Sequence, residues 1–340
     1  MREYIQKLVD RQSLTESEAA DAMRTIMSGK ATQAQMGSFL TALRMKGESV
    51  SDITAFARIM REFCVQIHPN AGRTLVDMCG TGGDTIKTFN ISTIASFVVA
   101  GAGVPVAKHG GRSVTSKSGS ADVLEALGAK IDLPPAAVER MIEEIGFGFM
   151  YAPVFHASMK HAVSPRKEVG IRTVFNVLGP LTNPASAQAQ VLGVYDSALV
   201  IPLADVLRHL GVERALVVHG VGGLDEVSTF GPTTVCEVRK GELLPYEIDP
   251  ADIGLARASP ADLAGGNAAE NAVLARRLLE GLERGPKRDV VLANAACGIY
   301  VGGAAATLYA AVEAAARSVD SGRAMAVLEA YVARSREAVA

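Results

Sequence analysis

The sequence lacks the charge imbalance that marks many nucleic-acid-binding proteins. Its 340 residues carry 34 basic and 36 acidic side chains, so the formal net charge is −2. A balance this close to neutral gives no support to nucleic-acid binding as the main task, although it allows a local basic patch. Repeats and low-complexity linkers are also missing. We therefore expect a folded globular chain with no nucleic-acid partner.

Cysteine is scarce, and its spacing matches no known framework. Cys64, Cys79, Cys236 and Cys297 form no C-x-x-C pair and no zinc-ribbon pattern. We interpret them as free thiols in a reducing cytoplasm. Cys79 lies beside a glycine-rich loop, but no His or Asn pattern supports a role as nucleophile, so we assign it to packing.

Segments that would direct the chain to a membrane are missing as well. Charged residues follow Met1 almost at once, where a signal peptide would have an apolar core. Residues 290–312 are uncharged and long enough to span a bilayer. They consist of Ala and Gly more than of Leu or Ile, which favours closely packed helices inside a protein. We expect no membrane partner and a cytoplasmic location.

The common catalytic signatures are absent, but two glycine-rich loops are present. There is no G-x-S-x-G, H-E-x-x-H, P-loop or G-x-G-x-x-G motif. Instead, the apolar run 75–78 leads into Gly80–Asp84, and the run 104–107 leads into Lys108–Ser113. Each loop then enters a helical pattern, and a glycine loop at a helix N-terminus binds anions through backbone N–H groups. Two such loops indicate a ligand with two anionic groups.

The first 64 residues predict a small helical unit. Thr15–Glu18 and Thr32–Gln35 are capping boxes, and Ser51 is the expected cap of a third helix. Gly29 and Gly47 are the expected helix stops.

After a connector at 68–72 the pattern changes to strands alternating with helices. The predicted strands are 74–78, 104–107, 129–133, 147–151, 189–194 and 214–218, and the helices between them are 92–101, 120–127, 135–145 and 198–210. Residues 153–185 predict short helices that cross between the subdomains, residues 227–248 an antiparallel ribbon, and the chain from 268 further helices. The expected fold class is α/β, with a small N-terminal helical domain plus a larger α/β domain whose mainly parallel central sheet is flanked by helices. Open sheets of this kind bind ligands at the carboxyl ends of their strands.

Polar residues collect at three such strand ends. The first loop is followed by Thr88, Asn90, Ser92 and Thr93, and the second carries Lys108, Arg112, Ser113, Thr115, Ser116, Ser118 and Ser120. The third, 219–226, ends in Asp225 and Glu226, whose hard oxygen atoms beside phosphates favour Mg²⁺. His109 and His219 flank these loops, and the sequence shows no carboxylate that would orient either as a base. Arg166, Lys167 and Arg172 are either solvated charges or, in one case, the anchor of a substrate carboxylate.

Taken together, these strings resemble the anthranilate phosphoribosyltransferase family over nearly the whole chain. The motifs that carry the resemblance are 77–84 (DMCGTGGD), 90–93 (NIST), 108–112 (KHGGR), 118–125 (SGSADVLE), 172–176 (RTVFN), 178–184 (LGPLTNP) and 224–226 (LDE). The related pyrimidine nucleoside phosphorylases share the architecture but match these strings poorly. Two alternatives stay open: such a phosphorylase, or a relative that binds nucleic acid without transferase activity.

The resemblance implies transfer of the phosphoribosyl group of phosphoribosyl pyrophosphate to the amine of anthranilate, in tryptophan biosynthesis, with Mg²⁺. It implies a helical domain over 1–66, completed by crossing helices at about 160–182, and a phosphoribosyl pyrophosphate-binding α/β domain over 72–340. It also implies a homodimer formed through the helical domain.

The resemblance also assigns site residues. Those implied for phosphoribosyl pyrophosphate are Gly80, Gly83, Asp84, Thr88, Asn90, Ile91, Ser92, Thr93, Lys108, His109, Gly110, Gly111, Arg112, Ser113, Val114, Thr115, Ser116 and Ser120. Those implied for anthranilate are Gly80, Gly111 and Arg166, and those for Mg²⁺ are Ser92, Asp225 and Glu226. No residue has to act as a nucleophile or strong base, because electrostatic stabilisation of the leaving pyrophosphate and correct placement of the amine carry the chemistry.

The chain departs from the family pattern at three positions. Gly111 stands where the family usually has an Asn that contacts anthranilate, so only backbone is available there. Thr115 stands where Ser is common and keeps the hydroxyl. Ala157 replaces a proline in the string 156–159 and keeps His156 in place.

Overall fold

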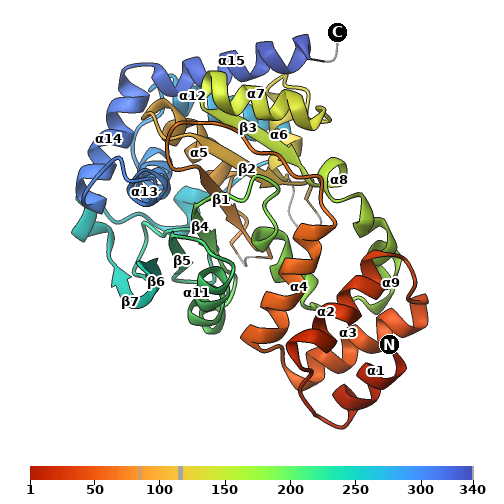
Figure 1. Cartoon of the computed structure of the whole chain (residues 1–340). Helices are drawn as coiled ribbons and strands as arrows, with labels where there is room; N and C mark the ends of the chain where they lie inside the picture. The colour runs from red at the N-terminus through yellow and green to blue at the C-terminus, as the bar shows by residue number, and fades with distance from the viewer. Residues whose placement is uncertain (84–85, 114–117, 339–340) are drawn as a thin grey trace.

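The chain folds into a helical part and a larger part built on one sheet (Figure 1). The computed structural model describes residues 1–83, 86–113 and 118–338. The N-terminus lies in the helical part, and the last helix lies at the far side of the sheet.

The helical part begins with α1 (Arg2–Val9), α2 (Glu16–Met27), α3 (Gln33–Lys46) and α4 (Val50–Glu62). The two predicted capping boxes, at Thr15 and Thr32, are confirmed. The predicted cap at Ser51 is wrong, because the N-cap of α4 is Ser49. The Ser49 hydroxyl accepts from the Asp52 N–H at 3.1 Å, and the Asp52 carboxylate accepts from the Ser49 N–H at 3.0 Å. Ser51 has no carboxylate three residues on, so only Ser49 can complete the reciprocal pair.

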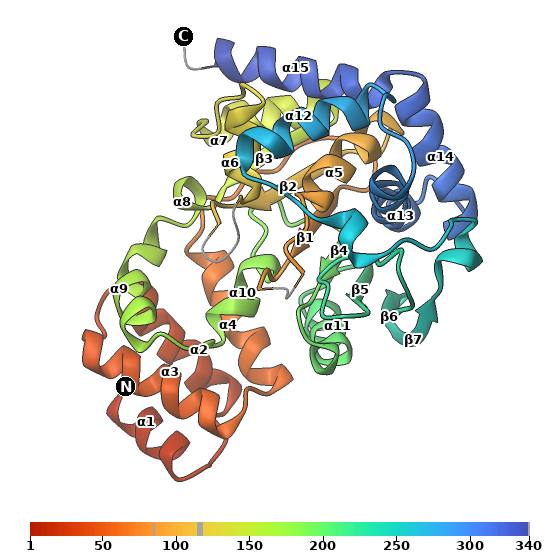
Figure 2. The ribbon, with the colours of Figure 1, turned by 180° about the vertical axis from the view of Figure 1, so that it is seen from behind.

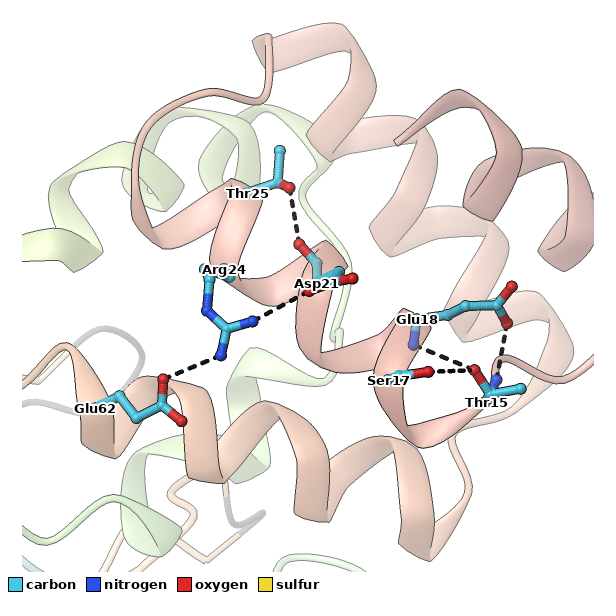
Figure 3. A network of polar contacts seen from close by, with 7 residues as sticks. All are labelled: Thr15, Ser17, Glu18, Asp21, Arg24, Thr25 and Glu62. Carbon is cyan, nitrogen blue, oxygen red and sulfur yellow. Dashed lines mark hydrogen bonds and ion pairs between the residues drawn. The ribbon is translucent and has the colours of Figure 1, made fainter.

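Figure 3 shows how α2 is fixed to α4. The Glu18 carboxylate accepts from the Thr15 N–H at 2.9 Å, which closes the first turn of α2. Arg24, later in α2, donates to Asp21 in the same helix and to Glu62 in α4, each at 3.1 Å. Both Arg24 contacts are exposed, so their contribution to stability is small.

One seven-stranded sheet, in the order β3-β2-β1-β4-β5-β6-β7, organises the larger part. Its strands are β1 (Val76–Gly80), β2 (Val106–Gly110), β3 (Phe147–Tyr151), β4 (Ala189–Gly193), β5 (Arg214–Gly220), β6 (Thr233–Arg239) and β7 (Glu242–Ile248). The first five pair in parallel, and β6 and β7 form the predicted antiparallel ribbon. Their two-residue turn has positive φ angles at Lys240 and Gly241, which suits the twist of a tight hairpin.

The predicted strand at 129–133 is wrong, because β2 pairs directly with β3 and leaves no gap for it. Ile131 and Leu133 are buried in an extended loop between α6 (Ser120–Ala126) and α7 (Pro135–Ile145). Their alternating apolar pattern therefore reflects burial of loop side chains, not a strand ladder.

Two apolar cores cover the two faces of the sheet. One joins the sheet to α5 (Ile91–Gly101), α6, α7 and the four C-terminal helices (Figure 2). The C-terminal helices are α12 (Ala268–Leu279), α13 (Pro286–Val301), α14 (Leu308–Asp320) and α15 (Arg323–Glu337). The other core joins α11 (Val200–His209) and the opposite face of β4–β6 to the helical part. Alternate residues separate the two cores, with Val191 facing the first and Leu192 the second.

A run of short helices connects the two parts, as predicted for residues 153–185. It comprises α8 (Ala152–Phe155), α9 (Lys160–Val169) and α10 (Phe175–Leu178), with 3₁₀ turns at Ala157–Met159 and Gly179–Leu181. Phe175 and Leu178 share the core that contains α2–α4. Further 3₁₀ turns lie at Ser197–Leu199, Pro250–Ile253 and Pro260–Leu263.

The uncharged segment 290–312 is divided between α13 and α14, with a break at 302–307. In the described part of the chain, no helix has the length and apolar character needed to cross a membrane.

Candidate functional site

The predicted residues meet at the carboxyl ends of β1, β2 and β5. The loop after β1 and the acidic pair after β5 are in direct contact, since the Gly82 N–H donates to Asp225 Oδ2 at 2.7 Å. A side chain at Gly80 would not fit, because its Cβ would lie 2.5 Å from the same carboxylate oxygen. The first glycine loop is therefore shaped to receive Asp225.

Glu226 reaches the start of α5. Its Oε1 accepts from the Ser92 N–H at 3.1 Å, so a carboxylate lies at the positive end of that helix. Burial, and then the charge of Asp225, raise the pKa of Glu226 to about 8. Burial also raises the pKa of Asp225. Two adjacent carboxylates repel each other when both are charged. A hard divalent cation bound between them would remove that repulsion.

Lys108 is buried close to Glu226 and is not in solvent. Its side chain is 1% exposed, and its ammonium donates to the carbonyl of Met78 and, at 3.4 Å, to Ser92 Oγ. Burial lowers the pKa of Lys108, while the neighbouring carboxylate of Asp77 opposes that shift. Lys108 thus joins β1 to the start of α5 and places a positive charge near Glu226.

Side chains that the sequence analysis singled out at the strand ends join the start of α5 to the second loop. Asn90 Nδ2 donates to the Ser118 carbonyl at 3.1 Å, and Ser118 Oγ donates to Asn90 Oδ1 at 3.2 Å. Thr93 and Ser120 hydrogen-bond through their hydroxyls at 2.9 Å. These contacts join the start of α5 to the end of the second glycine-rich loop and the start of α6.

Arg112 is paired with carboxylates of its own segment. Its guanidinium lies 2.9 Å from Asp122 and 2.5 Å from Glu125, and is about half exposed. Asp122 Oδ2 also accepts from the N–H groups of Ser113 and Gly119, at 3.2 and 2.8 Å. Asp122 therefore fixes both ends of the second loop, and the Arg112 guanidinium pairs with the Asp122 carboxylate.

The residues implied for anthranilate lie on different elements. Gly111 follows β2, and the nearest heavy atom to a Cβ built there is 4.0 Å away, on Ala152. Arg166 belongs to α9 in the crossing segment, with its guanidinium 5.1 Å from the centre of the Phe175 ring. Burial lowers the pKa of Arg166.

Three other predicted residues have structural contacts. Ile91 is part of the apolar core, Thr88 forms a bridge with Ala264, and Gly110 packs on Phe149 and Ser120. Asp84, Val114, Thr115 and Ser116 lie outside the described residues.

A pair of buried histidines lies behind the second loop. His109 and His156 have ring centres 4.9 Å apart, and the Nε2 atom of each has no hydrogen-bond partner among the described residues. Each ring also hydrogen-bonds a backbone group, at Gly179 and Thr182 respectively. Burial lowers the pKa of His109 to about 3 and that of His156 to about 4, so both rings are neutral at physiological pH.

The structure adds three residues for which the sequence assigned no such contact. Asp77 is fully buried beside Lys108 and accepts from the His109 N–H at 3.3 Å. Arg172 in the crossing segment donates to the Gly83 carbonyl at 2.7 Å and lies 4.0 Å from the ring centre of Tyr195. Asn271, on α12, donates to Asn90 Oδ1 at 3.0 Å. The motif containing Arg172 was noticed, whereas nothing local distinguishes Asn271.

Comparison with known proteins shows the family of this chain. A sequence-family model described as "Glycosyl transferase family, a/b domain" matches residues 72–325, and one described as "Glycosyl transferase family, helical bundle domain" matches residues 2–64. The anthranilate phosphoribosyltransferase of Moorella thermoacetica is 56% identical over 336 residues, which cover 98% of each chain.

Solved structures of anthranilate phosphoribosyltransferases are similar to this chain over nearly its whole length. The crystal structure of anthranilate phosphoribosyltransferase from Thermus thermophilus has a TM-score of 0.93 at 45% identity, covering 98% of this chain and 99% of that one. The enzyme from Saccharomyces cerevisiae, in complex with phosphoribosyl pyrophosphate and Mg, has a TM-score of 0.92 at 30% identity, covering 99% and 98%.

The fold and the site together define a glycosyltransferase with a helical bundle and an α/β domain. Within that class, the chain belongs to the anthranilate phosphoribosyltransferase family. Its activity is phosphoribosyl transfer to anthranilate, a reaction of tryptophan biosynthesis.

Proposed function

We propose that the cluster around Gly80, Ser92 and the Asp225–Glu226 pair binds phosphoribosyl pyrophosphate and directs its ribose C1 toward anthranilate. The observation that carries this proposal is the contact between the two halves of the cluster. Gly82 donates to Asp225, and Ser92 donates to Glu226, so an acidic pair lies between a glycine loop and a helix N-terminus. That combination suits an anion bound through backbone N–H groups together with a cation held by carboxylates.

Mg²⁺ fits the residues of this cluster. In the described ranges no three His, Cys, Asp or Glu side chains come together, which argues against a closed zinc-type cage. Mg²⁺ commonly takes one or two carboxylates and completes its shell with water and substrate phosphate. Asp225, Glu226 and the Ser92 hydroxyl would hold it. When bound, it would neutralise charge on the pyrophosphate leaving group.

The protein's own residues supply the remaining electrostatics. The acidic pair occupies the N–H groups of Gly82 and Ser92, so other N–H groups of the glycine loop and of the start of α5 would donate to phosphate oxygens. Lys108 adds positive charge near Glu226. Asp122 holds the two ends of the second loop together by accepting from Ser113 and Gly119. We assign the remaining predicted loop residues, including Asp84 and Val114–Ser116, to the same ligand.

Anthranilate would lie between Gly111 and Arg166. The open space at Gly111 supports this assignment, and so does the partly buried guanidinium of Arg166, which suits a carboxylate. The neutral His109–His156 pair lies close by in the chain, since His109 is two residues before Gly111. An uncharged neighbour suits an aromatic amine, which must keep its lone pair to attack C1.

The proposal includes the domain and subunit organisation expected from the family. Residues 1–66 with the crossing helices would form the helical domain, and residues 72–340 the second domain. The crossing helices share a core with α2–α4, which supports grouping them with the helical domain. Val9, Met45 and Val163 are 61%, 71% and 59% exposed on the neighbouring helices α1, α3 and α9, which supports a dimer through these helices. The four free cysteines support a cytoplasmic location.

The direct test is the loss of anthranilate fluorescence with phosphoribosyl pyrophosphate, with Mg²⁺ present and then chelated. A decay that requires all three components supports the proposal. Phosphate-dependent cleavage of uridine or thymidine, with anthranilate untouched, would favour a nucleoside phosphorylase instead. Light scattering on Val9→Asp and Val163→Asp, against Val273→Asp on the exposed face of α12, tests the dimer.

A further inference from the structure

The Asn90 side chain has its amide orientation fixed by neighbours. Its Oδ1 accepts from Asn271 Nδ2 at 3.0 Å and from Ser118 Oγ at 3.2 Å, which uses both lone pairs of the carbonyl. Its Nδ2 donates one hydrogen to the Ser118 carbonyl at 3.1 Å. An amide has two N–H donors, so one N–H of Asn90 is not needed for these bonds.

The amide orientation of Asn271 is also fixed by its neighbours. It is 2% exposed, its Oδ1 accepts from the Gly266 N–H at 2.8 Å, and its Nδ2 also lies 3.3 Å from the Gly266 carbonyl. Reversing the amide would set oxygen against oxygen and N–H against N–H. Asn271 therefore always presents a donor to Asn90.

Gly266 is itself held against the segment that leads into the site. Residues 264–266, which we name the strap, lie along residues 87–89. The Gly265 N–H donates to the Lys87 carbonyl at 3.0 Å, and Ala264 bridges Thr88. A Cβ at Gly265 would lie 2.4 Å from the Phe89 nitrogen, so the two backbones are in close contact.

We infer that Asn271 is a positioning residue for substrate binding: it orients the Asn90 amide so that an N–H, and not the carbonyl, faces the phosphoribosyl pyrophosphate. A phosphate oxygen is an acceptor only and repels a carbonyl oxygen. Without the Asn271 donor, the Asn90 amide is held through Ser118 alone, so its N–H is directed less firmly at the phosphate. This inference rests on the proposed function, because it needs Asn90 at the phosphate site.

The experiment measures binding of phosphoribosyl pyrophosphate with Mg²⁺ by calorimetry, and turnover by anthranilate fluorescence, in the full-length protein. Asn271→Ala should weaken phosphoribosyl pyrophosphate binding about tenfold, the scale of one hydrogen bond to a charged group. The KM for anthranilate should change less than about twofold, since that ligand lies elsewhere. Asn267→Ala is the matched control, because it removes the N-cap of the same helix without touching Asn90.

A double-mutant cycle separates orientation from general stability. In an Asn90→Ala background, Asn271→Ala should add less than about a twofold effect, since no amide remains to be oriented. Asn271→Ser, whose short hydroxyl cannot span both partners, provides the same test if the alanine variant fails to fold.

Two results would overturn the inference while the proposed function stands: unchanged binding in both Asn271 variants, or an equal loss in the Asn90→Ala background. A wild-type protein that neither binds phosphoribosyl pyrophosphate nor consumes anthranilate overturns the proposed function, and the inference with it.

Discussion

The carbonyl oxygen of Asp225 lies directly against Gly193, where a Cβ atom would be only 1.6 Å from it. Gly193 ends β4, and its strand partner Gly80 ends β1. A Cβ on Gly80 would meet the Asp225 carboxylate at 2.5 Å. Two glycines on adjacent strands thus leave the space that Asp225, which follows β5, occupies.

Substitution of Gly193 tests this arrangement. Gly193→Ala should displace Asp225 and Glu226 and lower kcat/KM by about a hundredfold or more, because misplaced groups lose much of their effect. Gly37→Ala in α3 is the control, since a Cβ there makes an ordinary 3.5 Å contact. Steady-state kinetics with circular dichroism provides the measurement, and full activity in Gly193→Ala would contradict the close contact.

Removal of the metal, or of its carboxylates, should abolish turnover. Chelation of Mg²⁺ should stop anthranilate consumption, and Asp225→Asn with Glu226→Gln should reduce it by about a thousandfold, since charge stabilisation of a leaving group accounts for several kcal/mol. Glu283→Gln, which removes an ion pair between the partly buried Glu283 and the exposed Arg277 away from the site, should leave turnover unchanged. Normal turnover in the double variant would exclude these carboxylates as metal ligands.

Gly111 should accept asparagine. Its surroundings leave about one side chain of space, and its φ angle is not in the left-handed region. Gly111→Asn should change the free energy of unfolding by less than about 0.5 kcal/mol. It should also lower the KM for anthranilate several-fold by adding a polar contact. Thermal unfolding and anthranilate saturation curves measure the two effects, and a raised KM would place anthranilate elsewhere.

The buried histidines predict loss of stability in acid. A buried neutral histidine has a folded pKa below its unfolded value of about 6.5, so the unfolded chain binds more protons between the two values. Stability is then constant above about pH 6.5 and falls as pH drops toward 4. With the pKa of His156 at about 4, that side chain should account for about 2 kcal/mol between pH 7.5 and 5.

His156→Asn isolates this contribution. Asparagine is a neutral residue that can still donate near Thr182, so the variant should lose about 2 kcal/mol less than wild type over the same pH range. Urea unfolding at pH 7.5 and 5 is the measurement. Equal losses in the two proteins would show that His156 is not a source of the acid sensitivity.

Arg172 should affect the first glycine loop from across the crossing segment. It donates to the Gly83 carbonyl and stacks on Tyr195, whose N–H in turn donates to Thr81 Oγ1 at 3.1 Å. Arg172→Ala should raise the KM for phosphoribosyl pyrophosphate about five- to tenfold, the combined scale of a charge-assisted hydrogen bond and an exposed cation–π contact. Arg24→Ala, which loses only exposed ion pairs, is the control. Equal KM values would mean that the Arg172 contact does not position the loop.

Local signals in the sequence were sufficient for much of the fold. The capping boxes at Thr15 and Thr32 form because each involves residues three apart. The alternation of strands and helices predicted a mainly parallel sheet, which β1–β5 form. The glycine loops lie at the strand ends where we propose that the substrate binds. The strand at 129–133 failed because burial of Ile131 and Leu133 in a loop produces the same alternation as a strand.

Residue types and motif order in the sequence determined the family, the reaction class and the acidic pair expected to hold Mg²⁺. Only the tertiary structure decided what each charge faces. Lys108 is buried near Glu226, Arg112 pairs with Asp122 and Glu125, and Asn271 contacts Asn90 across 181 positions of the chain. Hydrogen bonds and ion pairs act over a few ångströms in space, and separation along the chain does not report that distance.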